Sequence, residues 1–162
     1  MKKFGVPALA GIFKKIRSIR FGGNQKNRLK AGLQTDSEAS HLRTGRVGEA
    51  QAERFLKKDG LKIIARNVRV GYDELDLIAK EGDTLIFVEV KTRASEDFGR
   101  PAAAVNRAKR KKLSRAAMHF MKKHKLRPPH IRFDIIEVVG DKPEIRHIQN
   151  AFTLEGGYRI WW

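Results

Sequence analysis

The chain has 162 residues, 41% of them hydrophobic, and no cysteine, which suits one globular domain and excludes disulfides and thiolate metal sites. Its 35 Lys and Arg residues outnumber 18 Asp and Glu residues, so the net charge is +17. This excludes an acidic solvating protein and favours a polyanionic partner, either nucleic acid or an anionic membrane surface. No uncharged stretch approaches the roughly 20 apolar residues of a transmembrane helix, and we expect a cytoplasmic protein.

The positive charge is concentrated in two blocks. Residues 1–34 carry +9 and residues 98–133 carry +12, whereas the acidic residues lie in the remaining two segments. A uniformly solvated basic surface would not show this separation. The pattern predicts a phosphate-binding flank beside an acidic site.

Residues 1–40 are interpreted as a basic extension, residues 41–155 as the folded domain and residues 156–162 as an aromatic tail. In the extension, Leu9, Ile12 and Ile16 recur at helical spacing between lysines and arginines. Such an amphipathic helix could contact a membrane surface through residues 1–30, or nucleic acid. The alternative is a basic tail that becomes helical only when bound.

The pattern along the domain predicts seven elements in the order α-β-β-β-α-β-β. They are a helix over 44–59, strands over 61–69, 73–80 and 84–92, a helix over 101–124, and strands over 131–139 and 144–149. This order predicts a single α/β domain with a central mixed sheet flanked by helices.

A hairpin with Gly82-Asp83 as its turn would place Asp76 opposite Glu89 and Glu74 opposite Lys91. One face would then carry these four polar residues. The other face would be apolar and pack on a core, with Leu75, Leu77, Ala79, Ile86, Val88 and Val90.

Two facing carboxylates repel each other, by about 3 kcal/mol at 5 Å and an effective dielectric constant of 20. A hard divalent cation such as Mg²⁺ or Mn²⁺ would reverse the sign, so Asp76 and Glu89 are candidate metal ligands. Lys91 could position a water molecule or neutralise charge during phosphodiester hydrolysis. The alternative is an exposed strand face with incidental charges, in which Lys91 pairs with Glu74.

Asp76 followed by Glu89-Val90-Lys91 resembles the acid…(Asp/Glu)-x-Lys signature of restriction-endonuclease-like nucleases. From about Gly45 to Phe152 the chain resembles the YraN-like family of bacterial proteins. The matching stretches are Gly48-Glu49-Ala50, Ala65-Arg66-Asn67, Glu74 to Ile78, Phe87 to Arg93, Phe98-Gly99, Val105 with Lys109, Arg132-Phe133-Asp134 and Asn150-Ala151-Phe152.

The resemblance implies a fold similar to that of Holliday-junction resolvases, with Asp76 and Glu89 as metal ligands and Lys91 as catalytic lysine. It also implies that Glu49 is an accessory acid from the first helix, the alternative being a plain helix N-terminal acid favoured by the helix dipole. Glu74, on the polar strand face, is a further candidate accessory acid. The family usually has Gly where this chain has Asp73, which bears on the ligand set.

The helix over 101–124 places Lys109 on its inner face, as a phosphate contact or a snorkelling side chain. Arg107, Arg110, Lys111, Lys112 and Arg115 cover its other faces and are candidate contacts to a nucleic-acid backbone. Asp134 could brace the site or form a structural ion pair. In the tail, Trp161 and Trp162 could stack on bases or pack on the domain.

The sequence thus predicts a Mg²⁺- or Mn²⁺-dependent nuclease acting on DNA, with branched DNA as a candidate substrate. The alternative is a non-catalytic nucleic-acid-binding protein on a nuclease-like scaffold. DNA is the expected partner ahead of RNA, and a second copy of the chain is a further candidate partner.

Overall fold

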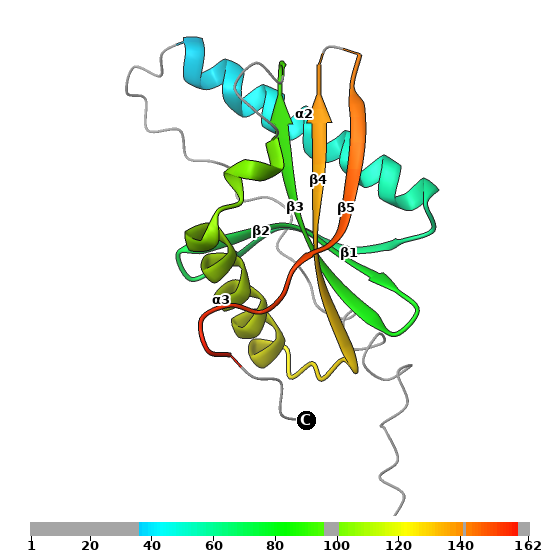
Figure 1. The fold of residues 1–162 in the computed structure, drawn as a ribbon, viewed down its shortest axis with the longest axis vertical. Coiled ribbons are helices and arrows are strands. Elements are labelled where there is room, and N and C mark those ends of the chain that lie inside the picture. Colours follow the sequence, from blue (N-terminus) through cyan, green and yellow to red (C-terminus); the bar gives the residue numbers. More distant parts are fainter. Residues whose placement is uncertain (1–35, 96–100, 141, 159–162) are drawn as a thin grey trace, which may run out of the picture.

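The computed structural model describes residues 36–95, 101–140 and 142–158 (Figure 1). The predicted N-terminal amphipathic helix, Trp161 and Trp162 lie outside these residues. The elements are α2 (Asp36–Lys58), β1 (Lys62–Val70), β2 (Asp73–Glu81), β3 (Thr84–Arg93), the 3₁₀ helix η1 (Pro101–Ala104), α3 (Arg107–Lys123), β4 (His130–Val139) and β5 (Glu144–Phe152). The predicted α/β class and element order are confirmed. In the described part of the chain, no helix has the length and apolarity to cross a membrane.

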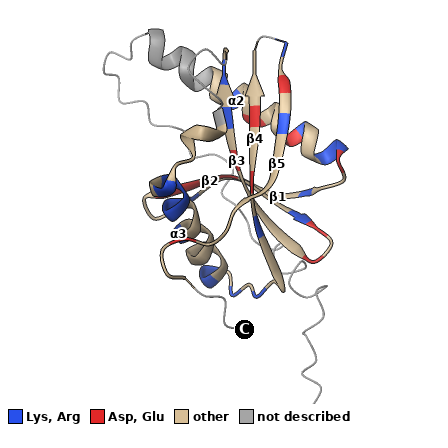
Figure 2. Cartoon of the chain, in the orientation of Figure 1, with Lys and Arg blue, Asp and Glu red and all other residues tan. Residues whose placement is uncertain are grey.

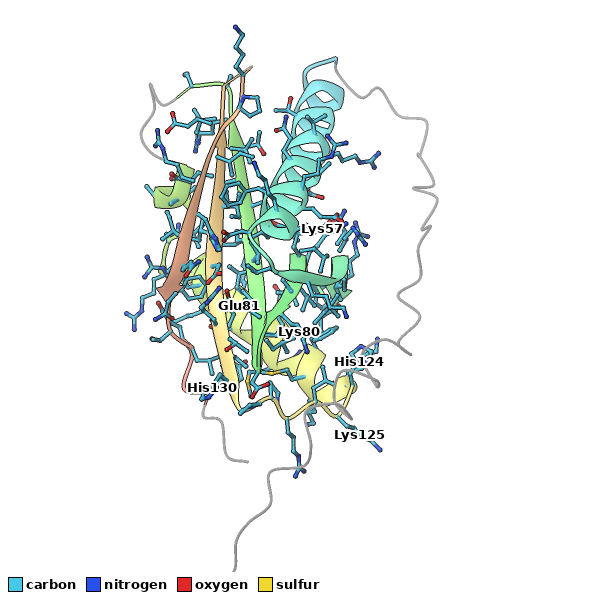
Figure 3. The ribbon with its side chains drawn as sticks, turned by 90° about the vertical axis from the view of Figure 1, so that its right-hand side faces the viewer. Lys57, Lys80, Glu81, His124, Lys125 and His130 are labelled. Carbon is cyan, nitrogen blue, oxygen red and sulfur yellow. The ribbon has the colours of Figure 1, made fainter. Side chains whose placement is uncertain are left out.

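Five strands form one mixed sheet in the order β1-β2-β3-β4-β5. Strands β3 and β4 are parallel, and the other neighbouring pairs are antiparallel. A parallel pair needs a long crossover connection, and η1 with α3 forms part of it. The β2–β3 turn, the end of α3 and the start of β4 therefore meet at one end of the sheet, where Glu81, Lys125 and His130 lie (Figure 3).

The two helices cover opposite faces of the sheet and create two apolar clusters. On the α2 side, Ala52 and Leu56 pack with Leu77, Val88 and Ile136. The α3-side cluster contains Ile78, Leu85, Phe87, Leu113, Phe120 and Phe133. Because β3 is covered on both faces, every side chain from Leu85 to Val90 is buried.

Both helices differ from their predicted bounds. Helix α2 begins at Asp36 rather than at residue 44, so it includes the end of the predicted extension. The helix expected over 101–124 is divided, because the Asn106 side chain accepts a hydrogen bond of 3.0 Å from the Lys109 backbone N–H and caps a new helix. The short η1 precedes this cap, and α3 begins at Arg107.

The predicted β2–β3 register is confirmed from Leu77–Val88 to the turn, but the ladder stops at Leu77–Val88. The predicted cross-strand pairs Asp76–Glu89 and Glu74–Lys91 are therefore wrong. Figure 1 shows β2 turning away from β3 toward α3, and Leu75 accordingly packs in the α3-side cluster instead of beside Leu77. The other five residues of the predicted apolar face pack on the α2 side as expected.

Candidate active site

Glu89 is the most enclosed charged group of the predicted site, with a side chain only 1% exposed. Its Oε1 atom lies 2.6 Å from Lys91 Nζ and 2.8 Å from Lys109 Nζ. Its Oε2 atom is buried and has no hydrogen-bond partner among the described residues. Strand β3 thus supplies the acid and one lysine, while the first turn of α3 supplies the second lysine.

Asp76 lies where β2 leaves β3. Its Oδ2 atom accepts a hydrogen bond of 2.8 Å from the backbone N–H of Val90, which replaces the strand pairing lost at this point. Burial and then the negative charge of Glu89 raise the pKa of Asp76 to about 7, against the opposing effects of the Val90 N–H and Lys109. The two carboxylates therefore interact, although they are not ladder partners.

Glu49 reaches the same neighbourhood from α2 because Gly48 allows a close helix–strand contact. A Cβ atom at Gly48 would lie 1.9 Å from Thr92 Oγ1, so only glycine fits this approach to β3. Burial raises the pKa of Glu49, a hydrogen bond with the Asn67 side chain opposes this, and the charges of Glu74 and Glu89 add to the increase. Three acids from separate elements thus share one electrostatic environment.

Glu74 and Asp73 point to other partners. Glu74 is exposed, and its Oε2 lies 3.8 Å from Arg69 Nε on β1, not beside Lys91. Asp73, the departure from the family pattern, binds Arg115 through two contacts of 2.7 and 2.9 Å. The Arg115 guanidinium lowers the pKa of Asp73, so this extra carboxylate is paired with α3.

The basic residues of α3 lie beside the acidic positions of the sheet (Figure 2). Lys111 and Lys112 are exposed. Arg107 and Arg110 lie 3.4 and 3.9 Å from the Glu155 carboxylate. Arg110 also donates a hydrogen bond to the Val105 carbonyl and lies over the Phe152 ring, 5.6 Å from its centroid. The arginines therefore have partners within the fold, and the two lysines face solvent.

Glu137 is a buried acid that the sequence interpretation did not single out. It pairs in register with Lys91 on the neighbouring strand, so the two side chains share a face of the sheet. Its Oε1 accepts a hydrogen bond of 2.7 Å from the Ala102 N–H in η1, and Arg146 Nη1 lies 3.8 Å from its Oε2. Glu137 thereby fixes η1 next to Lys91. An acid inside the run Ile135-Ile136-Glu137-Val138-Val139 was the available signal.

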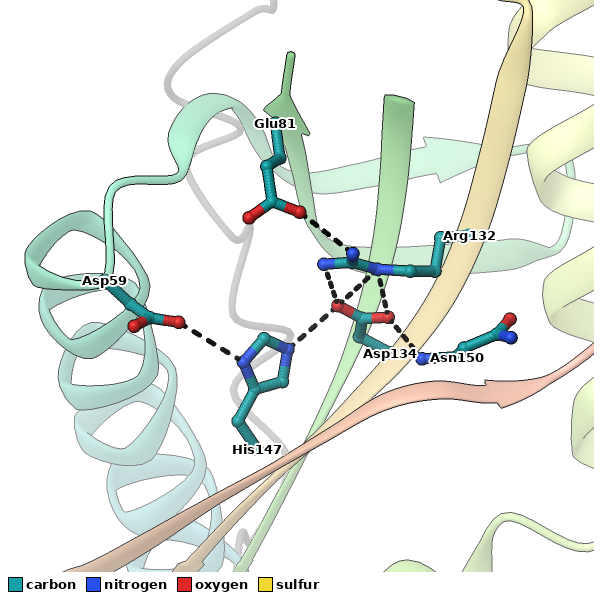
Figure 4. Close-up of polar contacts among 6 residues, drawn as sticks. All are labelled: Asp59, Glu81, Arg132, Asp134, His147 and Asn150. Atoms are coloured by element: carbon teal, nitrogen blue, oxygen red, sulfur yellow. Dashed lines mark hydrogen bonds and ion pairs between the residues drawn. The ribbon is translucent and has the colours of Figure 1, made fainter. Parts of the chain in front are cut away.

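Asp134 belongs to a separate network on the α2 side of the sheet, as shown by its pairing with Val88 (Figure 4). It accepts hydrogen bonds from Arg132 at 2.9 Å and from the Asn150 N–H at 2.9 Å, and lies 2.8 Å from His147 Nε2. The network supports the structural alternative for Asp134, because Asn150 lies at the irregularity in β4–β5 pairing.

The set of side chains near Glu89 that could bind a metal ion is small. Among the residues that the structure describes, no group of three or more His, Cys, Asp or Glu side chains is arranged to hold a metal ion. Asp76 and Glu89 nevertheless provide two mutually repelling carboxylates and one buried oxygen without a partner. This fits Mg²⁺, which is commonly held by one or two carboxylates, with water and substrate phosphate as the other ligands.

Comparisons with known proteins identify the family. The family model described as "Uncharacterised protein family UPF0102" matches residues 48–138. A UPF0102 protein of Desulfosudis oleivorans is 44% identical over 108 residues, which cover 67% of this chain and 88% of the relative. The Caldicellulosiruptor saccharolyticus protein is 44% identical over 112 residues, with coverages of 67% and 95%. That of Shewanella loihica is 41% identical over 116 residues, with coverages of 72% and 99%. With the matched segment holding Glu49, Asp76, Glu89 and Lys91, the chain belongs to the UPF0102 family, the YraN-like proteins.

Proposed function

We propose that this protein is a metal-dependent nuclease that hydrolyses phosphodiester bonds in DNA. The observation that carries the proposal is the environment of Glu89, a buried carboxylate with one unpartnered oxygen and two lysines within 2.8 Å. Its negative charge also lies close enough to Asp76 to raise the pKa of that carboxyl group. Buried carboxylate oxygens are normally hydrogen-bonded, so Oε2 of Glu89 retains capacity for a further ligand.

Asp76 and Glu89 would hold the metal. A bound Mg²⁺ or Mn²⁺ would neutralise the two carboxylates, polarise the scissile phosphate and lower the pKa of a water molecule. The protein holds Asp76 for this role through the Val90 N–H, which fixes the carboxylate at the point where β2 diverges. Substrate phosphate oxygens would complete the ligand set, which accounts for the small number of protein ligands.

The two lysines would stabilise the negative charge that develops on the phosphate during the reaction. Lys91 and Lys109 are 28% and 33% exposed, so both ammonium groups remain accessible while they contact Glu89. As a phosphate binds, each lysine can exchange part of its contact with Glu89 for a phosphate oxygen and stabilise the developing negative charge. Lys111 and Lys112 extend this positive surface for contacts to the nucleic-acid backbone.

Glu49 would serve as an accessory acid that holds or transfers a proton beside the reacting phosphate. Glu49 is half-buried, and burial raises its pKa, which favours the protonated form that an acid needs to donate a proton. Its side chain is oriented by the hydrogen bond with Asn67. The contribution of Glu49 should consequently be smaller than that of Asp76 or Glu89.

The proposal is tested with labelled branched, flapped, duplex and single-stranded DNA, and matched RNA, in Mg²⁺, Mn²⁺ or EDTA. We expect metal-dependent cleavage that falls at least about 100-fold in Asp76→Asn, Glu89→Gln and Lys91→Met, while DNA binding persists. Glu144→Gln is the matched control, because it removes an exposed acid from β5. Absence of cleavage by the wild-type protein on all substrates with both metals would contradict the proposal.

A second candidate is a non-catalytic nucleic-acid-binding protein on the same scaffold. It is favoured by the two lysines, which already neutralise Glu89 without a metal. Calorimetric titration with Mg²⁺ and Mn²⁺, alone and with a non-cleavable oligonucleotide, separates the candidates. Metal binding that disappears in Asp76→Ala and Glu89→Ala supports the nuclease. Metal-independent, strongly salt-dependent DNA binding without cleavage supports the second candidate.

A further inference from the structure

Tyr72 is fully exposed, with a relative exposure of 108%, in the turn that connects β1 to β2. Among the described residues, the large hydrophobic side chains left exposed are those of Tyr72 and Val47. The apolar Tyr72 ring is thus held in water beside the first residue of the strand that contains Asp76. It contributes nothing to either apolar cluster.

The turn that carries Tyr72 is tight and anchored. Val70 pairs with Asp73, so Gly71 and Tyr72 form a two-residue hairpin loop. Gly71 has a φ of +64°, as a type II′ turn requires at its first central position. The two contacts from Arg115 to Asp73 attach the end of this loop to α3. Tyr72 is therefore presented by a constrained backbone, which reduces the entropy lost on binding.

Helix α3 and the first part of β2 run side by side between Tyr72 and the candidate active site. At one end Lys109 contacts Glu89 and acts on Asp76, and at the other end Arg115 binds Asp73. The path along α3 from Lys109 to Arg115 is about 9 Å for six residues, and the path along β2 from Asp76 to Asp73 is about 10 Å for three residues, so the two lengths are similar. Lys112, which acts electrostatically on Asp73, lies between the two ends on α3.

We propose that Tyr72 stacks on an unpaired base of the substrate, a few nucleotides from the phosphate at Asp76 and Glu89. About 13 Å separates Tyr72 from Asp76 along β2, which equals roughly four nucleotides at the 3.4 Å spacing of a stacked strand and fewer in an extended one. A base inside a duplex has both ring faces covered by its neighbours. A flat ring on a protruding turn therefore selects single-stranded or unstacked nucleotides.

Charge favours nucleic acid over a protein as the occupant. The turn that carries the ring is attached through Asp73 to helix α3, whose segment is strongly basic, with no acidic residue between 98 and 133. Lys112 can contact the backbone of a strand whose base rests on Tyr72. The inference rests on the proposed function for the position of the reacting phosphate, and it specifies the substrate class as DNA with unpaired nucleotides next to the cleavage point.

The test measures binding by fluorescence anisotropy in EDTA, with the full chain. The probes are a labelled single strand of about 16 nucleotides, its duplex, and the same strand with abasic sugars. Tyr72→Ala should weaken single-strand binding about tenfold and leave duplex and abasic binding within about twofold. Tyr72→Phe should bind like wild type, and Val47→Ala is the matched control for an exposed apolar side chain. The salt dependence should be unchanged, because no phosphate contact is removed.

Equal single-strand affinity for Tyr72→Ala and the wild type would overturn the inference, as would equal losses on all three probes. A Tyr72→Ala variant that binds normally but changes the oligomeric state in sedimentation would also overturn it and assign the ring to a protein contact. If Tyr72→Ala loses binding only to the single strand and the wild type cleaves no substrate, the nuclease function alone is contradicted. If the wild type cleaves DNA but Tyr72→Ala does not distinguish the three probes, the stacking role alone is contradicted.

Discussion

Asp76 and Asp134 are both acids of the sheet, but their environments shift the side-chain pKa in opposite directions. Burial alone would raise the pKa of Asp134, but hydrogen bonds from His147, Arg132 and Asn150 N outweigh burial and lower it. The hydrogen bond from Val90 N does not outweigh burial and the charge of Glu89, so the pKa of Asp76 is raised to about 7. Burial raises the pKa of both carboxyl groups, and the balance is decided by the hydrogen-bond donors at Asp134 and by the scarcity of donors together with the charge of Glu89 at Asp76.

The contrast separates a structural network from a candidate reactive site. The Asp134 network joins β4, β5 and Glu81 of β2, and it is satisfied by the protein itself (Figure 4). The Asp76–Glu89 pair leaves one buried oxygen of Glu89 without a partner. A site that binds a cation or phosphate has to retain such unsatisfied capacity, and this capacity lowers stability until the ligand arrives.

The largest expected effect on stability is that of Asp134→Ala. This change leaves Arg132 and His147 without their buried partner and removes the acceptor for Asn150 N, so we expect a loss of about 3–5 kcal/mol in the free energy of unfolding. Urea denaturation monitored by circular dichroism measures it. A loss below about 1 kcal/mol would show that this network does not support the fold.

Asp76→Asn should have a smaller, opposite and pH-dependent effect. Because the folded-state pKa of Asp76 is raised from 3.8 to about 7, its stabilising contribution is complete below pH 4 and is lost as the pH rises to 7. Asparagine keeps an acceptor for Val90 N–H and carries no charge. We expect the variant to match wild type near pH 4 and to exceed it by on the order of 2 kcal/mol at pH 8.

Urea denaturation of both proteins from pH 4 to pH 9, without divalent metal, tests this expectation. Full ionisation of Asp76 across that range, seen as a constant difference between the two proteins, would contradict the raised pKa. Asp134→Asn provides the contrast, because a lowered pKa places its pH dependence below the unfolded value near 4.

The smallest effect is expected for Glu137→Leu, which removes the acceptor for the Ala102 N–H. We expect a loss of about 1 kcal/mol, the net value of one hydrogen bond, and retention of stability in Glu137→Gln, which can still accept this bond. Thermal unfolding of the three proteins provides the measurement. Equal losses in the leucine and glutamine variants would indicate that charge, not the bond to η1, is what Glu137 contributes.

The sequence alone determined much of the local structure. Turn residues and alternating apolar side chains predicted the five strands, their order with the helices and the β2–β3 register from Leu77 to the turn. These features are readable because turn chemistry and side-chain alternation act over a few neighbouring residues. The run from Phe87 to Arg93 likewise indicated the family, which the comparisons confirm.

The tertiary structure decided how the candidate site is assembled. Three interactions join residues from different elements: Val90 N–H with Asp76 where β2 leaves β3, Lys109 with Glu89, and the Ala102 N–H with Glu137. They depend on the direction in which β2 turns and on where the crossover returns to the sheet. Residue spacing along a single strand encodes neither of these two features. The sequence therefore identified the acids, whereas packing determined which of them remain unsatisfied.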